Sequence, residues 1–114
     1  MSPDEGIVRA MVDTYNARDL NRFVDCFAPD VVTLDGLGNQ TIKGHEGMRK
    51  VYGRLFDQSP KLHAEIKARM VVGKYVVTEE QVTGMNLEGH PSEAHMAIVY
   101  RVEDGKITRV QMLQ

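Results

Sequence analysis

Glu79 and Glu80 are the side chains whose position in the sequence first suggests acid–base chemistry. They lie within residues 75–87, where β-branched and alternating residues indicate a β-strand. Successive side chains of a strand point to opposite faces, so one of the two carboxylates faces the interior whichever face is covered. A buried carboxylate costs free energy unless it is paired or binds something, and it can serve as an acid or a base. The structural alternative is a hydrogen bond from Arg69, Arg101 or Tyr52.

Tyrosine and histidine side chains are the next candidates. Tyr15, Tyr52 and Tyr100 can donate hydrogen bonds, although an ordinary structural partner would serve a core tyrosine equally well. His63 and Glu65 share one face of a predicted strand, which alternation makes the outer face, and His45 lacks a second histidine four residues later. We therefore expect no metal site. Cys26 has no base beside it and is expected to be a small apolar residue. The sequence contains no serine-hydrolase elbow, phosphate-binding loop or dinucleotide fingerprint.

The first half of the chain predicts three helices that would position these side chains. Residues 2–5 combine a capping serine, an early proline and a glutamate three residues after the cap, which is typical of a helix start. Apolar residues then recur at helical spacing through Tyr15. Asp19 can cap a second, short helix that we expect Pro29 to end, and residues 45–57 predict a third.

The second half predicts strands. A short strand at 31–34 leads through Gly36–Asn39 into residues 40–43, and four longer strands follow at 62–70, 75–87, 92–103 and 106–113. Alternation predicts that the following side chains face inward: Leu62, Ala64, Ile66, Ala68, Met70, Met96, Ile98, Tyr100, Thr108, Val110 and Met112. Helices followed by a meander predict one α+β domain over residues 1–114, with three helices packed on an antiparallel sheet.

Composition narrows the function classes. The 114 residues carry a net charge of −2, which is too small to suggest a surface that follows nucleic-acid phosphates. No run approaches 18 apolar residues, and the first residues are acidic, so we expect neither a membrane span nor a signal peptide. A single cysteine excludes an internal disulfide and agrees with a cytoplasmic location.

Several segments resemble one family. They are Asn16–Leu20, Phe27–Val32 with Leu34–Gly36, Gly44–Arg49 and Tyr100–Ile107. Together they resemble SnoaL-like polyketide cyclases and ketosteroid isomerases, which belong to the nuclear transport factor two-like superfamily. The resemblance covers nearly the whole chain. It implies a cone-shaped, cystatin-like α+β fold in which a curved sheet wraps around the helices and encloses an apolar cavity.

The resemblance also implies a site. The catalytic aspartate of ketosteroid isomerases falls on Asp35, and the same alignment turns Glu79 and Gln81 inward, so Asp35 and Glu79 are the expected catalytic pair. The oxyanion donors of those isomerases fall on Met11 and near Ile98, neither of which has a proton to donate, so true ketosteroid isomerase activity is not expected. The residues expected to bind a substrate are Tyr15, Tyr52, Phe56, Met70, Gln81, Met96, Ile98, Tyr100 and Met112.

These observations predict a small enzyme that needs no cofactor and performs isomerase- or cyclase-like proton transfer on a hydrophobic cyclic or polyketide-like molecule. The alternative is a non-catalytic small-molecule-binding or dimerisation domain of the same fold. An epoxide-hydrolase-like activity would need an Asp-Arg-Asp cluster, of which only Asp35 can be assigned. Because relatives pair through the outer sheet face, the resemblance implies a homodimer there. The residues expected on that face are Val99, Ile107, Leu113, His63, Glu65, Arg69, His95, Arg101, Arg109 and Gln111.

Overall fold

The computed structural model describes residues 2–114, which form three helices and one six-stranded sheet. The elements are α1 (Pro3–Ala17), α2 (Leu20–Asp25), β1 (Phe27–Leu34), β2 (Gln40–Lys43), α3 (Gly44–Gln58), β3 (His63–Val72), β4 (Tyr75–Thr83), β5 (Ala94–Glu103) and β6 (Lys106–Leu113). The strand order is β2-β1-β6-β5-β4-β3. Neighbouring strands are antiparallel except β1 and β6, which are parallel, so the expectation of a wholly antiparallel sheet is corrected at that pair.

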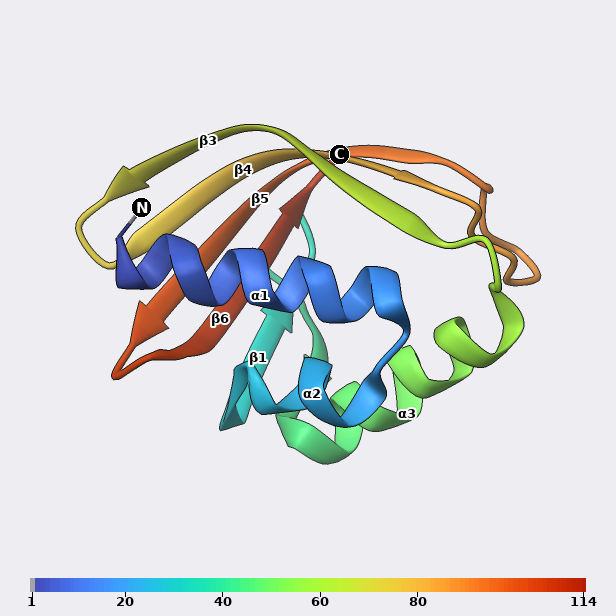
Figure 1. Ribbon diagram of the computed structural model, residues 1–114, viewed down its shortest axis with the longest axis horizontal. Helices are drawn as coiled ribbons and strands as arrows, with labels where there is room; N and C mark the ends of the chain where they lie inside the picture. The colour runs from blue at the N-terminus through green and yellow to red at the C-terminus, as the bar shows by residue number, and fades with distance from the viewer. Residues whose placement is uncertain (1) are drawn as a thin grey trace.

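The sheet curves over the helices, as Figure 1 shows. α1 crosses the concave face beneath β3 to β6, and α2 and α3 close the far end against β1. The helices and the concave face bury a common core that includes a cluster of aromatic rings from Tyr15, Phe23, Phe27, Tyr52 and Phe56. The predicted α+β class is confirmed. None of the helices in residues 2–114 combines the length and apolar character that a membrane span requires.

Local sequence signals set the helix starts. The Ser2 side chain accepts a hydrogen bond from the Glu5 backbone N–H, and the Glu5 carboxylate accepts one from Ser2, which confirms the capping box. Asp19 caps α2 through the Arg22 N–H. Pro29, however, lies inside β1 and does not end α2. It falls where the β1–β6 ladder is interrupted, between Phe27 and Val32, so its missing N–H breaks no pairing there.

A β-bulge in β3 changes which side chains face the helices. The register against β4 shifts between Ile66 and Ala68, so alternation restarts beyond that point. Ala64 and Ile66 face inward as predicted, but Ala68 and Met70 turn outward. Met70 is 57% exposed, which corrects its assignment as a substrate-binding residue. Arg69 turns the other way, onto the helix side, and its Nε lies 2.8 Å from the Glu5 carboxylate of α1.

A second bulge lies where β5 meets β6. Arg101 pairs with Arg109, but Val102 pairs with Ile107, so Thr108 is the extra residue. Ile107 is therefore fully buried in the core, which corrects its predicted place on the outer face. Beyond the bulge the predicted parity holds, since Val110 is buried and Met112 lies on the helix side.

Candidate functional site

A partly open cavity of about 60 Å³ lies between the helices and the concave face of the sheet. The apolar residues that line it are Met11, Val12, Phe23, Phe27, Met48, Ala64, Val82, Met96, Ile98, Val110 and Met112. The polar residues that line it are Tyr15, Thr33, Tyr52, Glu80 and Tyr100. Glu80 is the charged residue among them. The wall of the cavity therefore contains one carboxylate, and its other side chains are apolar or carry hydroxyl groups.

The Glu80 carboxylate is held by two hydroxyl groups on one of its oxygens. The side chain is only 3% exposed. Thr78 donates to Oε2 at 2.5 Å from the same face of β4, and Tyr100 donates to the same oxygen at 2.7 Å from β5. These two bonds fix the carboxylate against rotation, and they leave Oε1 with no donor among residues 2–114.

The second oxygen of Glu80 faces open space. Within residues 2–114 no fully enclosed side-chain oxygen or nitrogen lacks a hydrogen-bond partner. Because Oε1 has no partner, it is not fully enclosed, and the space that it borders is the cavity that Glu80 lines. No Lys or Arg pairs with Glu80 in the described part of the chain. The carboxylate therefore has one oxygen available to a ligand.

Tyr15 and Tyr52 supply hydroxyl groups in the same cavity. Their rings are 6.3 Å apart, and neither hydroxyl donates to a protein acceptor within residues 2–114. Burial and the nearby Glu80 charge raise the pKa of Tyr52 to about 12. Burial, with smaller effects from Tyr52 and Glu80, also raises the pKa of Tyr15, and burial beside Glu80 raises that of Tyr100. All three phenols therefore keep their protons near neutral pH and can act as donors.

Glu79 does not face the cavity, contrary to the prediction. Glu80 pairs with Ile66 and Met96, which belong to the concave face, whereas the Glu79 carboxylate lies outside, 2.7 Å from His95 Nε2. Gln81 shares the outer face with Glu79, so its assignment to the cavity is also wrong. The alternative phase, with Val76, Thr78, Glu80 and Val82 inward, is the one that the structure adopts.

Asp35 lies at the turn between β1 and β2, outside the cavity. Its Oδ1 accepts hydrogen bonds from the backbone N–H groups of Leu37 and Asn39, both at 2.9 Å. The bond from the Asn39 backbone, with those from Leu37 and the Asn39 side chain, lowers the pKa of Asp35. The carboxylate is thus occupied in holding the turn, and the structure does not bring Asp35 together with Glu79 or Glu80.

The other predicted binding residues divide between cavity and core. Tyr15, Tyr52, Met96, Ile98, Tyr100 and Met112 line the cavity. Phe56 is buried behind Tyr15, with ring centroids 5.4 Å apart, and does not reach the cavity. Thr78 was not among the predicted site residues, although it lies two residues before Glu80 and residues two apart on one strand point to the same side. Among residues 2–114 no three His, Cys, Asp or Glu side chains gather as metal ligands would.

Comparison with known proteins identifies the family. Residues 8–110 match the family model of the SnoaL-like domain. The chain belongs to the SnoaL-like family. A search of curated proteins gave no match.

Solved structures agree with this assignment. An uncharacterised cystatin-fold protein from Novosphingobium aromaticivorans is 33% identical over 100% of this chain and 99% of its own, with a TM-score of 0.87. A hypothetical protein with a ketosteroid isomerase-like fold from Catenulispora acidiphila, crystallised with trimethylamine, is 22% identical over 95% and 84%, with a TM-score of 0.74. A proposed polyketide cyclase from Sinorhizobium meliloti is 21% identical over 98% and 99%, with a TM-score of 0.78. The last two show the fold, and the family model confirms the predicted SnoaL-like relationship.

Proposed function

We propose that this SnoaL-like protein is an isomerase- or cyclase-type enzyme that uses Glu80 to move a proton at a carbon next to a carbonyl group. The substrate is a hydrophobic cyclic or polyketide-like small molecule, and the residues need no cofactor for this step. The observation that carries the proposal is the Glu80 carboxylate, buried in an apolar cavity with Oε2 bonded twice and Oε1 without a donor. The polyketide cyclase assignment of a similar structure supports the substrate class.

Each cavity residue then has a role. Glu80 Oε1 takes the proton from the carbon, the C–H electron pair forms a carbon–carbon double bond, and the carbonyl oxygen becomes an enolate oxygen. Tyr15 and Tyr52 donate hydrogen bonds to that oxygen, since their hydroxyls are protonated and unpaired within the described chain. Glu80 returns the proton at the original or a conjugated carbon, so atoms and charge balance.

The test measures deuterium uptake from D₂O at acidic C–H positions of open-chain ketones, cyclic ketones and 1,3-diketones by NMR. We expect Glu80→Gln to lower the uptake rate by about 100-fold or more, because general-base catalysis contributes about 10²–10⁴-fold. Asp35→Asn is the matched comparison. It makes the same carboxylate-to-amide change at Asp35, which the sequence resemblance predicts to be the catalytic base. We expect Asp35→Asn to retain the wild-type rate within about twofold, because its carboxylate serves the turn.

Two outcomes would contradict this proposal. Loss of uptake in Asp35→Asn with retention in Glu80→Gln would assign the base to Asp35. Equal, negligible uptake by all three proteins, in compounds shown to bind, would favour the alternative of a non-catalytic binding domain. That alternative draws its support from the same cavity, which can hold a ligand without chemistry.

A second copy of the chain is the partner that we propose for the outer face of the sheet. That face exposes Met70 and Val72, at 57% and 58%, together with Tyr75 and Leu113. Arg101 lies at one end of the face, and Glu79 lies nearer the other. In a two-fold pair, the positive end of one copy would oppose the negative end of its partner.

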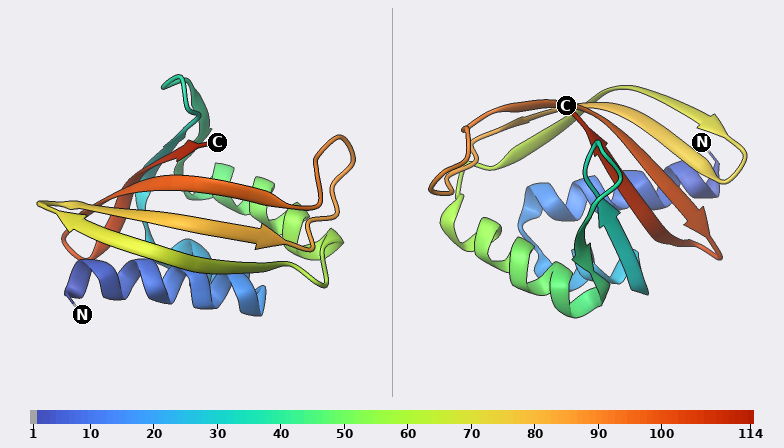
Figure 2. Two further views of the ribbon diagram at one scale, coloured as in Figure 1. Left: turned by 90° about the horizontal axis from the view of Figure 1, so that it is seen from above. Right: turned by 180° about the vertical axis from the view of Figure 1, so that it is seen from behind.

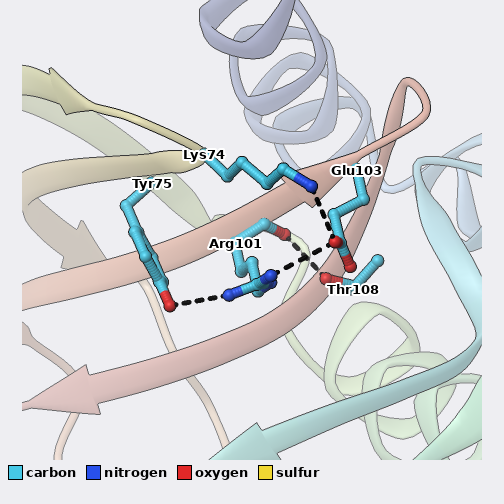
Figure 3. Close-up of polar contacts among 5 residues, drawn as sticks. All are labelled: Lys74, Tyr75, Arg101, Glu103 and Thr108. Carbon is cyan, nitrogen blue, oxygen red and sulfur yellow. Dashed lines mark hydrogen bonds and ion pairs between the residues drawn. The ribbon is translucent and has the colours of Figure 1, made fainter.

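Arg101 is held in place for such a contact, as Figure 3 shows. Its guanidinium donates to the Tyr75 hydroxyl at 2.8 Å and lies 3.2 Å from the Glu103 carboxylate, which also pairs with Lys74. Sedimentation of the wild-type chain should give twice the mass of 12.8 kDa. Met70→Glu should give the monomer, whereas Leu37→Glu, a matched change on the β1–β2 turn, should not. A wild-type monomer would refute the pairing.

A further inference from the structure

A wider space, which we call the outer chamber, shares part of its lining with the cavity. Its lining residues are Thr33, Leu34, Asp35, Gly36, Leu37, Thr41, Ile42, Val51, Tyr52, His90, Met112, Leu113 and Gln114. Figure 2 shows the segments that supply them around one end of the sheet: the β1–β2 hairpin, α3, the β4–β5 loop and the C-terminal end of β6. Thr33, Tyr52 and Met112 line both spaces, so they form the neck between the cavity and the outer chamber.

The two spaces differ in size by more than tenfold. The cavity holds about 60 Å³ and the outer chamber about 860 Å³. An apolar cavity of about 150 Å³ accepts benzene, so the cavity beside Glu80 is too small for a six-membered ring. A space of about 300–1,000 Å³ is typical of small-molecule sites, and the outer chamber falls within that range.

The walls of the two spaces also differ. Glu80 lies in the cavity and not in the outer chamber, whose apolar wall is supplied by Leu34, Leu37, Ile42, Val51, Met112 and Leu113. Leu37 and Val51 are 89% and 42% exposed there, so they present apolar surface to water that a ligand would cover. Asp35, Tyr52 and His90 carry its ionisable side chains, and the turn hydrogen bonds already occupy the Asp35 carboxylate.

We propose that the substrate is an elongated molecule that binds end-on. Its small carbonyl end passes the neck and reaches Glu80, while an apolar body of at least one ring stays in the outer chamber. This inference rests on the proposed proton transfer for the role of the carbonyl end. It implies that a carbonyl built into a bulky fused ring system reaches Glu80 poorly, whereas one at the end of a chain that carries a ring reaches it well.

Two ketones of similar reactivity test this arrangement. Acetone has only the reacting end, and 4-phenyl-2-butanone carries the same methyl ketone on a two-carbon chain with a ring. We expect the KM for deuterium uptake to be about tenfold or more lower for 4-phenyl-2-butanone, because its ring is buried in the outer chamber. Binding is measured separately by NMR chemical-shift titration, which does not depend on turnover.

Variants of α3 locate the ring. Val51→Trp narrows the outer chamber, so it should raise both the KM and the Kd for 4-phenyl-2-butanone about tenfold, and by much more than it changes the KM for acetone. Lys50→Trp adds the same bulk at the preceding, exposed residue, which lies outside the chamber, and should change neither ketone. α-Tetralone, with its carbonyl in a fused ring, should be exchanged more slowly than 4-phenyl-2-butanone.

The outcomes separate this inference from the proposed function. Tight binding of 4-phenyl-2-butanone that Val51→Trp weakens, without any deuterium uptake, would support the outer chamber and refute the proton transfer. Uptake at equal KM for both ketones, unaffected by Val51→Trp, would refute the outer chamber and leave the proton transfer standing. Equal effects of Val51→Trp and Lys50→Trp, or failure of 4-phenyl-2-butanone to bind at all, would also overturn the end-on arrangement.

Discussion

Glu79 and Glu80 are chemically identical neighbours that the curved sheet sends into opposite environments. Glu79 lies on the outer face, where its carboxylate meets His95 and water. Glu80 lies on the concave face, 3% exposed, where Thr78 and Tyr100 are its only donors within residues 2–114. The outer carboxylate can exchange its partner for water at little cost, whereas the inner one depends on the two hydroxyls that hold it.

This difference shows why position on the sheet matters more than residue type. The inner face combines a fixed carboxylate with unpaired phenols in a buried, mostly apolar setting, which strengthens each electrostatic contact. The outer face places similar groups in exposed ion pairs, such as Arg101 with Glu103. We therefore expect equivalent substitutions to have large effects inside and small effects outside, and the following predictions test that expectation.

The largest effect should come from removing a phenol that lines the same cavity as Glu80. Tyr52→Phe deletes one donor to the developing enolate, so we expect about a 10²–10³-fold fall in the rate of deuterium uptake. Since the pKa of Tyr52 is about 12, its hydroxyl stays protonated below about pH 11. Over that range, deprotonation of Tyr52 should not lower the wild-type rate. Tyr75→Phe makes the same change on the outer face and should leave the rate unchanged. A Tyr52→Phe rate within twofold of wild type would exclude Tyr52 as a donor.

The next effect concerns stability. Tyr100→Phe removes one of the two donors to Glu80 Oε2 and leaves a buried carboxylate partly unsatisfied, so we expect a loss of about 1–3 kcal/mol in the free energy of unfolding. Tyr75→Phe loses only the exposed bond from Arg101 and should cost less than about 1 kcal/mol. Urea unfolding at neutral pH measures both. Equal losses would mean that the Tyr100 bond is no more important than a surface contact.

A smaller effect should follow from breaking the outer ion pair. Glu79→Gln replaces the carboxylate that lies 2.7 Å from His95 Nε2 with a neutral amide, and both side chains are about half exposed. Exposed pairs contribute about 0–1 kcal/mol, so the free energy of unfolding should change by less than that amount. Deuterium uptake should stay at the wild-type rate. A fall in uptake comparable with that of Glu80→Gln would restore the sequence-based assignment of Glu79 to the cavity.

The sequence predicted the helices and strands better than it predicted which side chains of each strand face the core. Short sequence motifs determine three local features, so these could be predicted from a few neighbouring residues: the Ser2 capping box, the Asp19 cap and the hairpin at Gly105. The bulge in β3, by contrast, has no local signature. It reverses the side on which Met70 and Arg69 lie, because one extra residue exchanges the two faces of a strand.

The assignment of the carboxylates was limited in a different way. Alternation alone left Glu79 and Glu80 equivalent, and only the pairing of Glu80 with Ile66 and Met96 decides between them. Asp35 follows a strand and precedes a glycine. This pattern is found both for a catalytic aspartate at the end of a strand and for an aspartate that caps an Asx turn. The hydrogen bonds that the Asp35 carboxylate accepts from Leu37 and Asn39 decide in favour of the turn. These bonds form only because of the way the β1–β2 hairpin closes, which the sequence does not show.

The smallest effect should be the contribution of the Asp35 carboxylate to the pH dependence of stability. Asp35 is a third carboxylate, and it accepts hydrogen bonds within the β1–β2 turn. Backbone N–H donors lower its pKa in the folded state, so the turn adds stability above the unfolded pKa of about 3.9 and loses it as the pH falls through the folded pKa. Asp35→Asn should therefore be slightly less stable than wild type at neutral pH, and the difference should shrink on acidification. Thermal unfolding from about pH 7 to pH 2 measures it. A difference that grows toward low pH would show that the Asp35 carboxylate is destabilised in the fold, as expected for a catalytic group rather than for a turn cap.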